Sequence, residues 1–221
     1  MSLLFELSPS LKSQIDNLQP TAGYCIFIDS VGSTALKDNE PRVWLSRLYD
    51  IFALAKAYLK EFQPLKTIGD ALMYYIAEDE LKAKHQTALS LHLGLSFLVQ
   101  EKTTDVFGRT KVAIAHCKDA YRVTFVRGTE DIYGRDIDLS ARLLSVAQPG
   151  EIMMNERFAT EVVAEHRIAP VPTDFPDVER IMGPWTHRFK GFARDINIYK
   201  SPLGGTSLKK HLPDHYDGVF C

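Results

Sequence analysis

Apolar and polar positions along this chain follow two different periods, and the period changes from segment to segment. Over Arg42–Phe62 the apolar residues recur every three or four positions, which predicts an amphipathic helix. The same spacing predicts long helices over Leu81–Gln100 and Tyr133–Val146. A short lead-in helix is expected over residues 7–18, with Pro20 marking its end.

Runs of apolar and β-branched residues between these helices predict strands. The first is Tyr24–Asp29, and Leu65–Ile68 with Ala71–Ile76 forms a hairpin around Gly69-Asp70. The remaining expected elements are strand Lys111–His116, its partner strand Tyr121–Val126, strand Glu151–Asn155, helix Glu156–Glu165, loop Ala169–Pro176 and a final strand within Arg188–Lys200. Strands interleaved with helices predict an α/β sandwich in which helices cover a mixed sheet.

Composition narrows the class of protein. The 221 residues are 45% hydrophobic and 24% charged, as expected for one globular domain. The formal net charge of −2 argues against a broad nucleic-acid surface, and no apolar run approaches the ~20 residues that a membrane span needs. The N-terminus lacks a signal-peptide pattern, and three dispersed cysteines suit a reducing compartment. We expect a cytoplasmic protein without nucleic-acid or membrane partners.

Two strands of the predicted sheet end on an aspartate beside a glycine turn. Side by side, they bring Asp29 and Asp70 to one edge of the sheet, where paired carboxylates are suited to hold divalent cations against a triphosphate. Ser30 is a further candidate metal ligand. The loop residues Gly32, Ser33 and Thr34 precede a helical stretch, so their N–H groups are expected to contact phosphate oxygens.

Five segments, in this order, resemble the catalytic domain of class III nucleotidyl cyclases, the adenylate and guanylate cyclase family. The segments are Phe27-Ile-Asp-Ser-Val-Gly-Ser-Thr34, Leu65-Lys-Thr-Ile-Gly-Asp-Ala71, Asp131-Ile-Tyr-Gly-Arg-Asp-Ile-Asp-Leu-Ser-Ala-Arg142, Gln148-Pro-Gly-Glu-Ile152 and Phe189-Lys-Gly-Phe192. The resemblance implies a ferredoxin-like mixed sheet with covering helices. It divides the chain into a lead-in segment over residues 1–21, a catalytic domain over 22–200 and a tail over 201–221.

The resemblance also implies an activity and an assembly. Members of this family act as head-to-tail homodimers whose active sites lie between protomers, and they use two Mg²⁺ or Mn²⁺ ions to turn a nucleoside triphosphate into a cyclic nucleotide. By this similarity Asp29 and Asp70 are the metal ligands, and Arg142 stabilises the pentavalent phosphate. Lys190, and with a weaker alignment Lys118, correspond to cations on the leaving triphosphate.

One departure from the family pattern concerns catalysis. Asp138 stands where the family commonly has asparagine, four residues before Arg142 and on the same helix face. An acid there is expected either to pair with Arg142 or to add negative charge near the phosphates. It also motivates an alternative of another class, a catalytically inactive nucleotide-binding module that regulates a partner.

Lys66 and Asp131 fall where the family reads the nucleobase. Lysine only donates and aspartate only accepts hydrogen bonds, so the pair matches the ring nitrogen and amine of adenine, and the same pattern on cytosine. The compact chain also resembles stand-alone bacterial pyrimidine cyclases that make cyclic CMP or cyclic UMP in antiphage defence. The base therefore stays open, with ATP slightly favoured.

Overall fold

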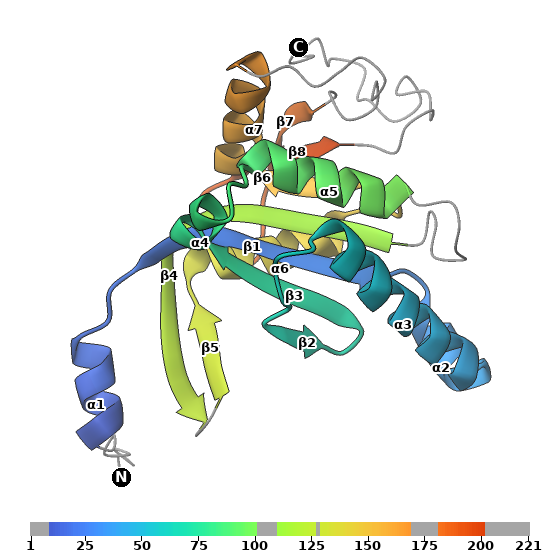
Figure 1. Cartoon of the computed structure of the whole chain (residues 1–221), viewed down its shortest axis with the longest axis horizontal. Helices are drawn as coiled ribbons and strands as arrows, with labels where there is room; N and C mark the ends of the chain where they lie inside the picture. The colour runs from blue at the N-terminus through green and yellow to red at the C-terminus, as the bar shows by residue number, and fades with distance from the viewer. Residues whose placement is uncertain (1–8, 101–109, 127–128, 169–180, 202–221) are drawn as a thin grey trace.

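A computed structural model of the chain describes residues 9–100, 110–126, 129–168 and 181–201, and shows one sheet with helices packed against it (Figure 1). The strands are β1 Thr21–Ser30, β2 Lys66–Ile68, β3 Ala71–Ala77, β4 Thr110–Val126, β5 Thr129–Tyr133, β6 Ile152–Asn155, β7 Met182–His187 and β8 Ile196–Ser201. The helices are α1 Pro9–Asp16, α2 Ser33–Asn39, α3 Pro41–Tyr58, α4 Glu78–Ala83, α5 Ala88–Gln100, α6 Arg135–Val146 and α7 Glu156–Ile168. Among these helices, none has the length and apolarity needed to cross a membrane.

The eight strands follow the order β2-β3-β1-β4-β6-β8-β7, with β5 paired to β4 outside this path. Strand β1 is antiparallel to both of its neighbours, so Ile26 lies opposite Tyr74 on β3 and Ile114 on β4. Strand β6 runs parallel to β4. A mixed sheet with covering helices confirms the predicted fold class.

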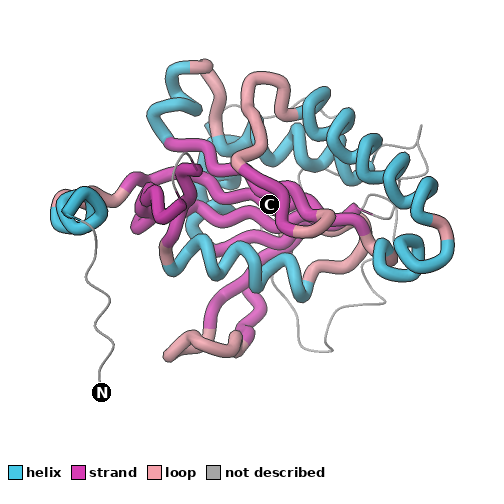
Figure 2. Tube along the Cα trace, turned by 90° about the horizontal axis from the view of Figure 1, so that it is seen from below, coloured by secondary structure: helices cyan, strands magenta, loops and turns pink. Residues whose placement is uncertain are grey.

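Helices cover both faces of the sheet, so its central strands are apolar on both sides (Figure 2). On β1, Tyr24, Ile26 and Ile28 pack in the core formed with α3, α5 and α7. The alternate residues Cys25 and Phe27 pack in the core formed with α6. This two-sided burial explains why the sequence of β1 reads as one apolar run ending at the polar pair Asp29-Ser30.

The helix predicted over Leu81–Gln100 is in fact two helices, α4 and α5. The chain turns at His85, whose backbone is left-handed with a φ of 54°. A new helix then begins with reciprocal bonds: Thr87 Oγ1 accepts from the Ser90 N–H at 3.2 Å, and Ser90 Oγ accepts from the Thr87 N–H at 2.8 Å. These local capping bonds override a helical periodicity that continues across the break.

One predicted strand pairing was also wrong. The predicted partner strand Tyr121–Val126 does not pair with Lys111–His116, because both lie in the single 17-residue strand β4. The partner of the second half of β4 is β5, which the sequence did not predict.

Strand β7 was not predicted either, because Pro184 interrupts its pattern. This strand lies at the end of the strand order, and an edge strand tolerates a residue without an N–H donor. The predicted loop Ala169–Pro176 lies outside the described residues.

A polar cluster joins the sheet to the helices near the opposite end of β1 from Asp29. His116 Nε2 lies 2.7 Å from Glu78 of α4, and its Nδ1 lies 2.9 Å from Glu161 of α7. Tyr24 donates a hydrogen bond to Glu161 at 2.7 Å. Burial works to lower the pKa of His116, but the two carboxylates outweigh it and raise this pKa above its ordinary value. When it is protonated, His116 pairs with both carboxylates and so ties α4 to α7 on one face of the sheet.

A His116→Gln variant is expected to lower the free energy of unfolding by about 2 kcal/mol at pH 6, because charge-assisted hydrogen bonds are lost. The histidine pKa is higher folded than unfolded, so its contribution is complete below the unfolded pKa of about 6.5 and disappears as pH rises through the folded value. Urea unfolding of both proteins at pH 6 and pH 9 checks this. A difference that is equal at both pH values, or larger at pH 9, would contradict it.

Candidate active site

The structure brings Asp29 and Asp70 together at one edge of the sheet. Ile28 on β1 pairs with Leu72 on β3, so Asp29, the next residue of β1, comes beside the β2–β3 turn that carries Asp70. The side chains are 20% and 16% exposed respectively, so both carboxylates are mostly buried but open to solvent on one side. The negative charge of Asp70 acts on the titration of Asp29, as expected for close carboxylates.

Each of these carboxylates faces a lysine that the sequence reading missed. Lys37 of α2 places Nζ 3.0 Å from Asp70 Oδ1, and Lys111 of β4 places Nζ 3.4 Å from Asp29 Oδ2. Lys111 lies directly opposite Asp29 in the antiparallel register of β1 and β4. Register is therefore the signal that would have found it, whereas the contact of Lys37 depends on how α2 packs.

The two carboxylates differ in their proton affinity. Burial raises the pKa of Asp29 above its ordinary value, and the charge of Asp70 adds to this while Lys111 opposes it. Burial also acts to raise the pKa of Asp70, but hydrogen bonds from the Ser33 hydroxyl and Lys37 outweigh it and lower that pKa. Ser33 is buried beside this carboxylate.

This edge has the ligand chemistry that a divalent cation requires. Asp70 Oδ2 is buried and has no hydrogen-bond partner, so one carboxylate oxygen is left free to accept a cation. Ser30 follows Asp29 directly and is buried. Carboxylate and carbonyl oxygens are the hard donors that Mg²⁺ and Mn²⁺ favour. Within the described residues no cluster of three or more His, Cys, Asp or Glu side chains is present, so these residues fit a site that takes further ligands from phosphate and water.

The loop between β1 and α2 contains the candidate phosphate contacts. Gly32 has a φ of 78°, in the left-handed region where glycine is preferred. Thr34 is exposed, while the Ser33 side chain turns inward to Asp70. The helix that follows has only seven residues.

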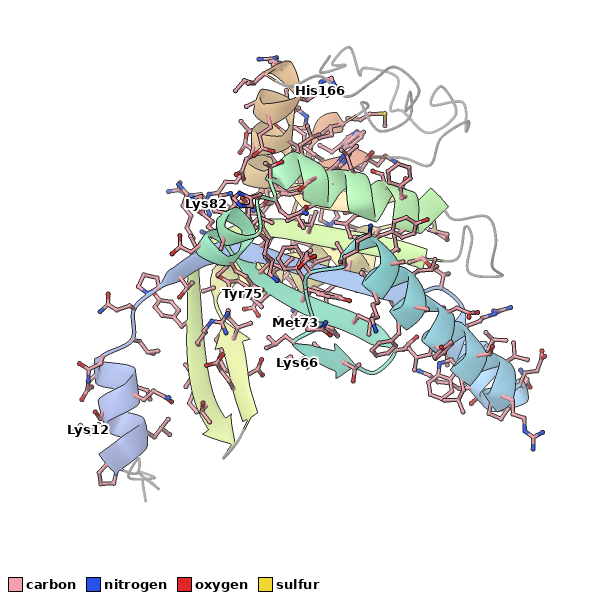
Figure 3. The ribbon with its side chains drawn as sticks, viewed as in Figure 1. Lys12, Lys66, Met73, Tyr75, Lys82 and His166 are labelled. Atoms are coloured by element: carbon pink, nitrogen blue, oxygen red, sulfur yellow. The ribbon has the colours of Figure 1, made fainter. Side chains whose placement is uncertain are left out.

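Lys66 and Asp131 form a second polar group, on β2 and β5. Lys66 Nζ donates to Asp131 Oδ1 at 2.6 Å, and Figure 3 shows Lys66 on β2 beside Met73 of β3. Asp131 Oδ1 also accepts from the Ile132 N–H at 2.8 Å. Burial acts to raise the pKa of Asp131, but the bond from Lys66 outweighs it and lowers the pKa. Residues 65 positions apart in sequence are therefore each other's charge partner.

The remaining predicted site residues do not join either group. Arg142 and Asp138 are exposed on α6, and Lys190 is exposed after β7. No ion pair joins Asp138 to Arg142, both of which lie in the described part of the chain, so the expected pairing is not observed. Lys118 is exposed on β4, where its backbone N–H lies 3.4 Å from Asp136 Oδ2.

Comparison with known proteins identifies the family. A family model described as the adenylate and guanylate cyclase catalytic domain matches residues 22–169. The chain therefore belongs to this family, and the protein is a nucleotidyl cyclase, a phosphorus–oxygen lyase. No curated protein sequence matches the chain.

Solved structures share the fold at low sequence identity. The adenylyl cyclase CyaB from P. aeruginosa is 19% identical, with a TM-score of 0.61 over 83% of this chain and 95% of that one. An adenylate cyclase from Trypanosoma brucei, in its monomeric state, is 16% identical, with a TM-score of 0.63 over 87% and 94%. A dimeric guanylyl cyclase domain from the aquatic fungus Blastocladiella emersonii is 11% identical, with a TM-score of 0.53 over 82% and 96%.

Proposed function

We propose that this chain is an active, metal-dependent cyclase that converts a nucleoside triphosphate, with ATP slightly favoured, into a 3′,5′-cyclic nucleotide and pyrophosphate. The observation that carries the proposal is the half-buried Asp29 and Asp70 pair with its free Oδ2 atom, in a member of the cyclase family. The catalytic domain is proposed to span residues 22–200.

In this reaction the ribose 3′-oxygen attacks the α-phosphorus, and the bond to the bridging oxygen of the β-phosphate breaks. Asp29, Ser30 and Asp70 would hold two Mg²⁺ or Mn²⁺ ions, which when bound lower the pKa of the 3′-hydroxyl and screen the phosphate charge. Gly32, Ser33 and Thr34 position the loop beside the phosphates. Arg142 stabilises the charge that develops at phosphorus.

The active site is proposed to form between two copies of the chain. Arg142, Asp138 and Lys190 are exposed and contact neither aspartate, which supports a site that is completed by the opposing surface of a second protomer. Lys190, with Lys118 as a weaker candidate, then neutralises the leaving pyrophosphate. Asp138 is not tied to Arg142, so the arginine is available for this role.

Base selection is proposed to depend on Lys66 and Asp131. Without a base, Lys66 donates to Asp131. When a base binds, its ring nitrogen would accept from Lys66 and its amine would donate to Asp131, so each side chain exchanges its partner for a matching group of the base. Adenine and cytosine both have this pattern, whereas guanine and uracil present a carbonyl beside a ring N–H. The alternative products are cyclic CMP, which matches this pattern, and cyclic UMP, and either would give the chain a role like that of antiphage pyrimidine cyclases.

The test is incubation with Mn²⁺ and ATP, GTP, CTP or UTP separately, with products identified by mass spectrometry. We expect cyclic AMP from ATP as the main product. If cyclic CMP or cyclic UMP is the main product, the substrate is a pyrimidine nucleotide and not ATP. No cyclic product from any of the four, from a folded dimer, would overturn the proposed activity in favour of a regulatory nucleotide-binding module.

A Lys66→Met variant is expected to raise the KM for the preferred nucleotide about tenfold and to reduce discrimination between bases, because one base-reading bond is lost and Asp131 loses its charge partner. Lys60→Met, which replaces an exposed lysine before β2, is the matched control and should keep wild-type kinetics. Steady-state kinetics with ATP and GTP measure both effects. An unchanged ratio of kcat/KM for the two nucleotides would contradict the role of Lys66.

A further inference from the structure

Lys37 is a cation held inside the proposed metal site by two contacts. Its Nζ lies 3.0 Å from Asp70 Oδ1 and 5.0 Å from the centroid of the Trp44 ring. Trp44 belongs to α3, which packs against α2, and the Glu40 N–H donates to Leu36 O at 2.7 Å where the two helices meet. The ammonium therefore lies between a carboxylate on the β2–β3 turn and an aromatic face on the next helix.

This contact differs from the ordinary surface ion pairs of the chain. Lys82 pairs with Glu78 at 3.3 Å within one helix, and the two side chains are 70% and 29% exposed. The Lys37 and Asp70 side chains are less exposed, at 36% and 16%, and Asp70 keeps its second oxygen buried without a hydrogen-bond partner. Lys37 thus neutralises one oxygen of a carboxylate whose other oxygen is available to a cation.

A divalent cation at Asp70 conflicts with Lys37 in its present position. A metal ion on this carboxylate would come within a few ångströms of Nζ, and like charges at that separation repel strongly where water is partly excluded. The lysine side chain is 36% exposed, so its four-carbon stem has room to move its charge away from Asp70. Trp44 keeps the ammonium near the site because its ring face attracts cations.

We propose that Lys37 is a resident cation of the metal site: it neutralises Asp70 before metal binds, a divalent ion displaces it, and the displaced ammonium then contacts the triphosphate of the substrate. This inference rests on the proposed function, since it needs Asp70 to be a metal ligand. Lysine is a suitable phosphate ligand because it acts as a mobile point charge. The same side chain therefore weakens metal binding before the nucleotide arrives and strengthens nucleotide binding afterwards.

The first test measures Mn²⁺ binding to the full chain without nucleotide, by electron paramagnetic resonance of free Mn²⁺. Lys37→Met keeps a straight apolar stem over Trp44 and removes the charge. It is expected to bind Mn²⁺ about fivefold more tightly than wild type, the size of one partly exposed ion pair. Lys56→Met, an exposed lysine of α3, should bind as wild type does. Wild-type Mn²⁺ affinity in Lys37→Met would overturn the displacement.

The second test measures the phosphate contact independently of base and turnover. In calorimetric titrations with inorganic tripolyphosphate in excess Mn²⁺, Lys37→Met is expected to bind about tenfold more weakly than wild type, from the loss of one charge-assisted contact. Lys37→Arg, which keeps the charge, should recover most of this affinity. Equal tripolyphosphate affinity in Lys37→Met and wild type would overturn the transfer to phosphate.

The outcomes separate this inference from the proposed function. Circular dichroism checks that each variant is folded, and Lys37→Gln provides a second neutral side chain if Lys37→Met is not. Failure of the wild-type protein to bind Mn²⁺ would overturn both the metal site and the role of Lys37. If the wild-type protein binds Mn²⁺ but forms no cyclic product, the proposed activity is overturned. The two Lys37 measurements still decide the role of Lys37, because neither depends on turnover.

Discussion

Replacing Asp70 with asparagine is expected to leave the chain folded and to reduce cyclase turnover at least a thousandfold. The reason is that the amide carries no charge, so a proposed metal ligand is lost where the substrate itself brings several negative charges. A loss of about 4 kcal/mol in transition-state stabilisation corresponds to this factor. The measurement is the initial rate of cyclic nucleotide formation in saturating Mn²⁺, beside a thermal unfolding curve.

The control for this variant is Asp38→Asn, which removes an exposed acid from α2 and should keep wild-type turnover. Asp29→Asn is expected to match Asp70→Asn, because the two carboxylates lie at the same edge of the sheet. Turnover near the wild-type rate in either aspartate variant would show that the pair is not the metal site.

Mixing two inactive variants is expected to restore activity. In a head-to-tail dimer one site takes its aspartates from the first chain and its arginine from the second, so a chain with Asp70→Ala and a chain with Arg142→Ala form one intact site per mixed dimer. Random pairing of equal amounts should recover about a quarter of the wild-type specific activity, since half of the dimers are mixed and each has one of two sites. The measurement is turnover against mixing ratio after co-refolding.

Each variant alone serves as the control for this experiment and should stay inactive at every concentration. Native mass spectrometry of differently tagged chains counts the mixed dimers. If mixed dimers form but activity is not recovered, Asp70 and Arg142 of one chain belong to the same site. The proposed arrangement of the site between two chains would then be wrong.

The sequence was sufficient for the elements whose signals are local. The buried run of β1 and the hairpin of β2 and β3 were predicted closely, because apolar runs and a Gly-Asp turn are signals within a few residues. It was insufficient where tertiary pairing decides. The continuation of β4 past Ala120 and its pairing with β5 depend on contacts between distant segments, and the sequence pattern alone reads as two strands.

The candidate site likewise contains residues that the sequence identified and residues that it missed. The motif spacing pointed to Asp29 and Asp70, and the structure brings them to one edge. The family resemblance pointed to Lys66 and Asp131, which the structure joins by an ion pair. Lys37 was missed because its contact arises from the packing of a short helix against the sheet, which has no periodic signal. The exposure of Arg142 follows from the amphipathic pattern of α6, whose buried positions are Ile137, Leu139, Ser140 and Leu143, whereas the exposure of Lys190, which lies outside any helix or strand, follows from no periodic pattern.

Strand β4 carries a position opposite each polar group, since Lys111 near its start lies opposite Asp29 on β1 and Val123 near its end lies opposite Asp131 on β5. Between these positions the register of β4 against β1 shifts at Cys117–Ala120, where β4 has one more residue than β1. Side chains alternate along a strand, so the number of residues in this irregularity decides which face the second half of β4 presents. Inserting or deleting one residue there would therefore change the position of Asp131 relative to the sheet without touching Asp131 itself.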